Sequence, residues 1–388
     1  MEKIMKKFQL NPIFLLLGGL LFQAHAYGAT EKNPESQVQM VAIDSFSQLQ
    51  DAVQTLKTEN KQKNLSNTLI VMDDDDTLTM MECADRKDPK SCQFLGGPAW
   101  FSWQENLLKQ YQSNHPIQQN LNLLQQLEKK NGKLTKQEKE LKREQDKLTK
   151  ENSNTVKPPL VANNMEDLLD IAALLLAINN MPYTEEKEVP SVLKTLTKDQ
   201  AKLLVLTARG TSNLSATESQ FAALTATKAD QKKGTAAVSF QELIHNNALN
   251  GKKSGIASIA GPFKPQKCLP KPDRAKAREV SYQQGVMYVA GQNKGEMLKC
   301  LLSRTDSGQI KNIFFIDDTL QNVVDVFSAF EGQDQYKVTA MHYTYLKKHK
   351  AAFMSEKALQ DKANKRWEDI KDSLNAHLKS PTAISAPK

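Results

Sequence analysis

The sequence predicts an α/β fold in which helices cover both faces of a parallel sheet. Its 388 residues are enough for one large domain with an insertion, or for two domains. Hydrophobic residues make up 39% of the chain and charged residues 25%, which is typical of a folded globular protein. Strand and helix patterns alternate in the second half of the chain, and this alternation favours a parallel sheet.

The first expected elements lie before residue 79. A helix begins after Ser45, a residue type that caps helices, and runs to about Leu56 with one apolar face. That face carries Phe46, Leu49, Val53 and Leu56. The run Thr68–Met72 is short, apolar and rich in β-branched residues, so we expect a buried strand there.

Strand and helix patterns alternate again after residue 201, and a lysine-rich helical pattern follows them. The expected strands cover residues 202–207, 285–290, 312–316 and 338–343. The expected helices lie within residues 215–225 and over residues 294–302 and 320–330. Residues 346–388 are expected to form a C-terminal helix followed by a frayed tail.

The N-terminal 26 residues have the pattern of a secretory signal peptide. Three lysines precede an apolar run at residues 13–22, and Ala24-His25-Ala26 is a small-x-small cleavage site. The run is too short to span a bilayer comfortably, although an uncleaved anchor is the alternative. We expect a secreted or periplasmic protein that begins near Tyr27 without a stable membrane anchor.

The four cysteines could form disulfides in an exported protein. Cys83 and Cys92 lie close together in a loop-like stretch that a disulfide could staple. Cys268 is the third, and Cys300 lies in an apolar helical pattern where it could be a buried free thiol.

The net charge is +8, but the lysines are spread along the chain without an arginine patch, so specific nucleic-acid binding is not expected.

Residues 79–201 differ in character from the sequence on either side. A Gly-Gly-Pro turn and an aromatic cluster open the segment, and a highly charged helical pattern follows over about residues 120–156. Leucines recur there every seven residues, as in a coiled coil, but their companion positions are mostly polar. We therefore expect an exposed helical extension rather than a dimerisation zipper.

The strand at Thr68–Met72 delivers a run of four aspartates, Asp73 to Asp76. Open α/β sheets place their active sites at the carboxyl ends of their strands. Because strand side chains alternate, Asp73 and Asp75 can point into one crevice, where one carboxylate attacks phosphorus and the other exchanges protons. The alternative is a solvated acidic turn or an adventitious Ca²⁺ site.

Asp73, Asp75, Thr77 and Leu78 resemble motif I of the haloacid dehalogenase-like superfamily. Three further motifs of that family have counterparts here in the same order. Thr207 ends the expected strand at residues 202–207, Lys294 begins an expected helix, and Asp317-Asp318 ends an apolar strand. Carboxylates at the end of an apolar strand are costly unless a cation or another partner is present.

The resemblance implies a Rossmann-like parallel sheet, a helical cap inserted after the first core strand, and a Mg²⁺ cofactor. Asp73 would be the nucleophile, and Asp75 the acid and base whose backbone carbonyl also binds Mg²⁺. Thr207 and Lys294 would hold the phosphoryl group. Asp318 would be the direct metal ligand, with Asp317 beside it. Oxygen ligands suit this hard cation. The implied core covers residues 27–78 and 202–345, with the cap at residues 79–201.

Within that superfamily, the chain is similar to secreted class B acid phosphatases and their relatives. The similarity rests on the signal peptide, the Asp-Asp-Thr ending of motif I, Thr207-Ala208-Arg209, and the Gly97-Pro98-x-Trp100 stretch. Two features depart from the pattern of that group. Asp317-Asp318 stands where Gly-Asp is expected, and the inserted segment is much longer. The substrates of that group are therefore not transferred to this chain.

The sequence therefore predicts an exported, Mg²⁺-dependent phosphomonoesterase acting on a small phosphorylated substrate. The alternative is a secreted binding or virulence protein that keeps this scaffold and contacts a partner through residues 120–156. The identity of the substrate and the oligomeric state are not determined by these patterns.

Overall fold

The computed structural model confirms an α/β fold with a mostly parallel sheet. It describes residues 37–114, 135–136, 138–140, 142–143, 159–228, 236–250, 262–263 and 278–378. The main sheet has eight strands in the order β1-β10-β9-β2-β3-β8-β7-β6. Their bounds are β1 (Val38–Ile43), β2 (Thr68–Met72), β3 (Lys202–Thr207), β6 (Pro262–Phe263), β7 (Val280–Gln283), β8 (Val286–Tyr288), β9 (Asn312–Asp317) and β10 (Lys337–Tyr343).

The strand β2 lies in the middle of the sheet, parallel to β9 on one side and β3 on the other. All five of its residues are buried, because both faces of the sheet are covered by helices. A strand covered on both faces needs a continuous apolar run rather than an alternating one. The run Leu69-Ile70-Val71-Met72 meets this requirement, and the bounds of the strand are those that the sequence predicted.

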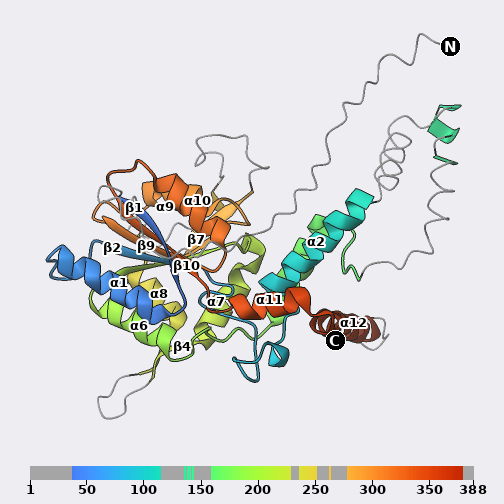
Figure 1. The fold of residues 1–388 in the computed structure, drawn as a ribbon, viewed down its shortest axis with the longest axis horizontal. Coiled ribbons are helices and arrows are strands. Elements are labelled where there is room, and N and C mark those ends of the chain that lie inside the picture. Colours follow the sequence, from blue (N-terminus) through green and yellow to red (C-terminus); the bar gives the residue numbers. More distant parts are fainter. Residues whose placement is uncertain are drawn as a thin grey trace, which may run out of the picture. The chain divides into compact units, whose positions relative to one another are not determined.

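Helices form a layer on each face of this sheet (Figure 1). On one face, α1 (Phe46–Glu59), α6 (Glu188–Lys198) and α8 (Phe240–Asn247) pack into one hydrophobic cluster with the strands. On the other face, α9 (Lys294–Arg304) and α10 (Leu320–Phe330) pack into a second cluster. The remaining short elements on the core are η2 (Thr211–Asn213), α7 (Leu214–Ala223) and the antiparallel pair β4 (Thr225–Thr227) and β5 (Val238–Ser239).

Several elements were not predicted from the sequence. β1 pairs in parallel with β10 at the edge of the sheet, and its residues alternate too little to stand out as a strand. β7 pairs antiparallel with β8, so the chain direction reverses at the turn between them, where Gly285 has φ +83°. Such a φ angle favours glycine, and a Cβ atom there would lie 2.4 Å from Ile244 Cγ2. The geometry of this turn therefore depends on packing against α8, a helix distant from it in the sequence.

The inserted segment leaves and rejoins the core at one place. Thr79 forms an antiparallel bridge with Tyr183, and the backbone N–H of Met80 donates to Pro182 O at 2.9 Å. The Thr184 hydroxyl donates to Thr77 O at 2.7 Å. The chain between Met80 and Pro182 contains η1 (Pro89–Ser91), α2 (Pro98–Asn114) and α5 (Met165–Ile178). The next helix, α6, packs beside α1 on the sheet.

A third hydrophobic cluster joins the inserted helices to the C-terminal helices. Side chains of α2 and α5 pack there against α11 (Lys347–Ser355) and α12 (Lys357–Leu378). Phe353 is fully buried, and its ring centroid lies 4.7 Å from that of Phe94 and 5.8 Å from that of Trp103. The lysine-rich C-terminal segment is helical, as predicted, and it holds the inserted helices as well.

Three predicted segments fall largely or wholly outside the described residues. The charged extension at residues 120–156 and its leucine repeat lie almost entirely outside them, and so do the signal peptide and the tail beyond residue 378. Within the described part of the chain, no helix combines the length and apolar character needed to cross a membrane.

Candidate active site

The carboxyl ends of β2 and β9 bring Asp73 and Asp317 together. The backbone pairing of the two strands continues past Met72, because the Asp73 N–H donates to Ile316 O at 2.9 Å. Asp73 is 5% exposed and Asp317 is fully buried. Two ionised carboxylates this deeply buried repel one another, and they require a cation nearby.

Lys294 supplies one positive charge at this point. It is the first residue of α9, whose N-cap Asn293 accepts a hydrogen bond from the Glu296 N–H. Its ammonium group contacts Asp73 and lies 2.7 Å from Asp317 Oδ2. Burial opposes the charge on Lys294, but the two carboxylates outweigh this effect and raise its pKa. Lys294 is therefore held as a cation between two acids.

The pKa of Asp73 depends on burial and on the same charged neighbours. The contact with Lys294 lowers this pKa, but burial has the larger effect and raises it to about 8. The neighbouring charge of Asp317 raises it further. A single ammonium group therefore does not neutralise this cluster of acids, and a second cation would stabilise its ionised form.

Asp317 and Asp318 are held by groups from three different segments. Asp317 Oδ1 accepts from the Thr319 N–H at 2.8 Å, and both of its oxygens lie 3.1 Å from the side-chain amide of Asn322. The Asp318 N–H donates to the Thr77 hydroxyl at 3.0 Å. The Asp318 carboxylate contacts the ammonium group of Lys350 on α11.

Three carboxylates could hold a metal ion here. One oxygen each from Asp73, Asp317 and Asp318 lie within 4.8 Å of one another. All-oxygen ligands at the end of a buried strand suit a hard divalent cation, and the raised pKa of Asp73 agrees with a site that gains from one. The residues present therefore fit a hard divalent cation. The side chain of Asp75 does not belong to this group of three.

Asp75 instead forms a bidentate ion pair with Arg209. Arg209 Nε lies 2.9 Å from Asp75 Oδ2, and Arg209 Nη2 lies 2.6 Å from Asp75 Oδ1. The same Nη2 is 3.2 Å from Asp74 Oδ2. Arg209 is 5% exposed, and although burial opposes its charge, the two carboxylates raise its pKa. The side chain of Asp75, predicted as acid and base, is thus held by an arginine at the end of β3.

Arg209 also links the site to the inserted helices. Its Nη1 donates to the Thr217 hydroxyl at 2.9 Å and to Gln220 Oε1 at 2.8 Å. The amide nitrogen of Gln220 in turn donates to Leu176 O on α5 at 2.5 Å. A continuous chain of hydrogen bonds therefore runs from Asp75 to α5.

Thr207 lies at the carboxyl end of β3, as predicted, and is fully buried. Its hydroxyl accepts a hydrogen bond from the Arg209 N–H at 3.2 Å. The strand β3 is the neighbour of β2, so Thr207 stands at the same edge of the sheet as Asp73. Of the six predicted site residues, Asp73, Lys294, Asp317 and Asp318 form one contact group, whereas Asp75 and Thr207 contact Arg209.

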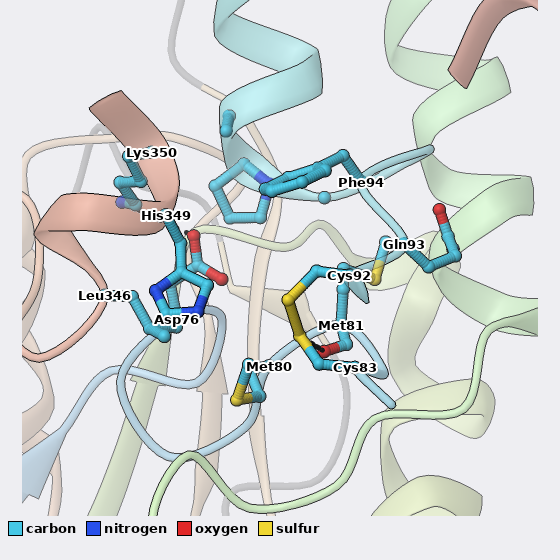
Figure 2. A pocket seen from close by; sticks show the side chains of 13 residues that line it. Asp76, Met80, Met81, Cys83, Cys92, Gln93, Phe94, Leu346, His349 and Lys350 are labelled. Carbon is cyan, nitrogen blue, oxygen red and sulfur yellow. Dashed lines mark hydrogen bonds and ion pairs between the residues drawn. A yellow bond between two sulfur atoms is a disulfide. The ribbon is translucent and has the colours of Figure 1, made fainter. Parts of the chain in front are cut away.

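A small pocket lies beside this group, between the start of the inserted segment and α11 (Figure 2). Asp76, His349 and Lys350 line it together with the Cys83–Cys92 disulfide. This disulfide is the pairing that the spacing of the two cysteines suggested. The alternative of a free thiol at Cys300 is wrong, because Cys300 is also disulfide-bonded. An apolar helical pattern alone does not distinguish a buried thiol from a disulfide.

Three residues of the site were not predicted from the sequence. Arg209 follows the expected strand directly, and its position after Thr207 was the one available signal. Asn322 lies on α10 one turn after Asp318, and nothing in the sequence around it indicates a role in the site. Lys350 is one lysine in a lysine-rich helix far along the chain, and only the packing of α11 brings it to Asp76 and Asp318.

Comparison with known proteins identifies a family but no activity. A family model described as "Protein of unknown function (DUF2608)" matches residues 145–379, which include Thr207, Lys294 and Asp317 but not Asp73. No curated protein and no solved structure matches the chain. Because the matched residues make up more than half of the sequence, the chain belongs to the DUF2608 family.

Proposed function

We propose that this protein is an exported phosphomonoesterase that depends on a divalent metal, with Mg²⁺ as the expected ion. The observation that carries the proposal is the position of Lys294, whose ammonium group contacts both Asp73 and Asp317. A buried carboxylate beside a buried ammonium group provides a nucleophile together with a positive charge for the phosphoryl oxygens. The order of motifs that resembles the haloacid dehalogenase-like superfamily supports the same reaction.

In the first step, a carboxylate oxygen of Asp73 bonds to phosphorus while the bond from phosphorus to the ester oxygen breaks. Asp75 enters this step as the protonated acid, released from Arg209. It gives its proton to the departing oxygen and becomes a carboxylate. In the second step, water bonds to phosphorus and gives a proton to Asp75. The bond between phosphorus and Asp73 then breaks, and inorganic phosphate leaves.

Asp73, Asp317 and Asp318 would hold the metal ion. The ion would supply positive charge that offsets the charge of the phosphoryl oxygens during transfer. Lys294 would bind the same oxygens from the N-terminus of α9, and Thr207 would contribute its hydroxyl from β3. In this proposal the inserted helices α2 and α5 act as a cap over the carboxyl edge of the sheet.

The test is hydrolysis of p-nitrophenyl phosphate by the mature chain, with Mg²⁺ and with EDTA. We expect activity with Mg²⁺, its loss in EDTA, and its loss in Asp73→Asn, which keeps the shape of the side chain but removes the nucleophilic oxygen. Asp334→Asn, an exposed position before β10, is the matched control and should behave as the wild type. Full activity in Asp73→Asn would refute the mechanism.

A further inference from the structure

Lys350 forms ion pairs with two acids at the edge of the proposed active site. It lies on α11, and its Nζ contacts the Asp318 carboxylate and is 3.5 Å from Asp76 Oδ2. Figure 2 shows Lys350 beside Asp76. The side chains of Asp318 and Asp76 are only 7% and 10% exposed, so water compensates little of their charge. The ammonium group of Lys350 therefore stabilises both acids.

Asp318 also belongs to the group of three carboxylates that could hold a metal ion. A divalent ion bound there and the ammonium group of Lys350 would both draw on the negative charge of this one side chain. Two cations at the same carboxylate repel each other, and the repulsion is strong because the site is largely buried. Each cation therefore weakens the binding of the other to Asp318.

The two lysines that contact this acidic cluster differ in how easily they can leave it. The side chain of Lys294 is 1% exposed, whereas that of Lys350 is 29% exposed. A fully buried ammonium group cannot reach water unless the fold opens. A lysine at the surface can turn its flexible chain into solvent and keep its charge hydrated. A metal ion can therefore displace Lys350 from Asp318, but it cannot displace Lys294 from Asp73.

The backbone of α11 is held independently of the ion pairs of Lys350. Phe353 lies one turn after Lys350, is fully buried, and packs against Phe94 and Trp103 of the inserted segment. This apolar packing keeps the helix in place while the lysine side chain changes its surroundings. Exchange of Lys350 for a metal ion at Asp318 thus requires a side-chain movement only.

We propose that Lys350 is an internal counter-ion that competes with the metal ion for Asp318 and so determines how tightly the site binds a divalent cation. The inference rests on the metal site of the proposed function. It gives a role to α11, an element after the last strand of the sheet and outside the motifs that carry the family resemblance. Lys350 takes no part in the chemical steps, and it sets the metal concentration at which the site fills.

The test measures the dissociation constant of Mn²⁺ by EPR, because Mn²⁺ accepts the same oxygen ligands as Mg²⁺ and the free ion gives the signal. Lys350→Met removes the charge but keeps an unbranched chain, and we expect it to bind Mn²⁺ about tenfold more tightly than the wild type. Lys350→Arg keeps the charge and should bind nearly as the wild type does. Lys348→Met, at an exposed position on the same helix, is the matched control and should have the wild-type affinity.

Thermal unfolding of the same proteins gives a second readout. Without metal, Lys350→Met should unfold at a lower temperature than the wild type, because Asp76 and Asp318 lose their cation, and added Mn²⁺ should raise its melting temperature by more. Equal dissociation constants in the two proteins, or weaker binding by Lys350→Met, overturn the inference and leave the proposed hydrolysis intact. If neither protein binds Mn²⁺, the inference fails together with the metal site, and hydrolysis in EDTA then decides separately whether the phosphatase proposal stands.

Discussion

Arg209 forms a bidentate ion pair with Asp75 through nitrogen–oxygen distances of 2.9 and 2.6 Å, and its guanidinium group also contacts Asp74. Both aspartates follow β2, whereas Arg209 follows β3. Only a planar fork of donors can satisfy this arrangement, since a lysine offers a single charged point. The pair therefore locks the loop after β2 to the loop after β3.

Replacing Arg209 should destabilise the fold strongly. Arg209→Gln leaves the buried Asp74 and the partly buried Asp75 without their cation, and we expect a loss of about 3–5 kcal/mol in the free energy of unfolding. The double variant Arg209→Gln/Asp74→Asn should recover part of this loss, because one uncompensated charge is gone. Urea unfolding at pH 7 measures both. A loss below about 1 kcal/mol in the single variant would mean that the ion pair contributes little.

Lys294 is expected to matter for both stability and activity. Lys294→Met fits the same volume but leaves Asp73 and Asp317 facing each other without an ammonium group, so both hydrolysis and stability should fall. Lys299→Met on the same helix is the control, because its side chain is 32% exposed and its ion pair with Glu296 is a surface pair. If the two variants unfold at the same urea concentration, Lys294 is not acting as a buried counter-ion.

Gly295 sets the close approach of α9 to α10. A Cβ atom at this position would lie 2.3 Å from the backbone oxygen of Asp325 and 2.5 Å from Ala329 Cβ. Gly295→Ala should therefore push the two helices apart, cost about 1–3 kcal/mol, and displace Lys294 from Asp73. Gly308→Ala meets nothing within 4 Å and is the control. Thermal unfolding should separate the two variants, and equal melting temperatures would contradict the packing described.

The raised pKa of Asp73 predicts a pH dependence of stability without added metal. Its ordinary pKa is 3.8 and burial raises it to about 8 in the folded state. The folded protein thus favours the protonated form. The contribution of this group is fully present below about pH 4 and is lost as the pH rises through about 8. Asp73→Asn removes the titration, so its melting temperature should exceed that of the wild type by more at pH 8 than at pH 5. An equal difference at both pH values would contradict the shift.

Phe353 packs the C-terminal helices against the inserted segment through its contacts with Phe94 and Trp103. Truncating this buried ring to alanine removes its contacts with Phe94 and Trp103 and should cost about 3–5 kcal/mol. Met354 is the next residue and is 41% exposed, so Met354→Ala should cost far less. Limited proteolysis should cut Phe353→Ala near α11 before the wild type. Equal resistance in the two proteins would mean that α11 is held by other contacts.

Local patterns were enough to predict the central elements. The apolar run of β2 and the helical periodicity of α10 placed both elements with the bounds found in the structure. The strand-end argument predicted the site at Asp73, and the resemblance to the haloacid dehalogenase-like motifs implied that Asp317 belongs to it. The helix at Lys294 was also placed correctly. These features depend on residues close together in the chain, which is the information a single sequence carries best.

Contacts between distant segments could not be predicted in this way. The edge strand β1, the antiparallel turn into β7, and the packing of α11 against α2 all depend on partners far away in the sequence. The partner of Asp75 is another example, because a carboxylate beside a strand end can face a metal, a substrate or an arginine. Only the position of β3 next to β2 selects Arg209.

The sequence by itself determined the type of fold, the central strand and the acids that end it, since apolar runs and helical periodicity are local consequences of burial. The tertiary structure alone decided which further charges meet these acids. Arg209 and Lys350 are two cations among 52 lysines and arginines. They reach the acidic cluster because β3 and α11 are packed around the end of β2, and the free energy of that packing comes from apolar surfaces elsewhere on those elements.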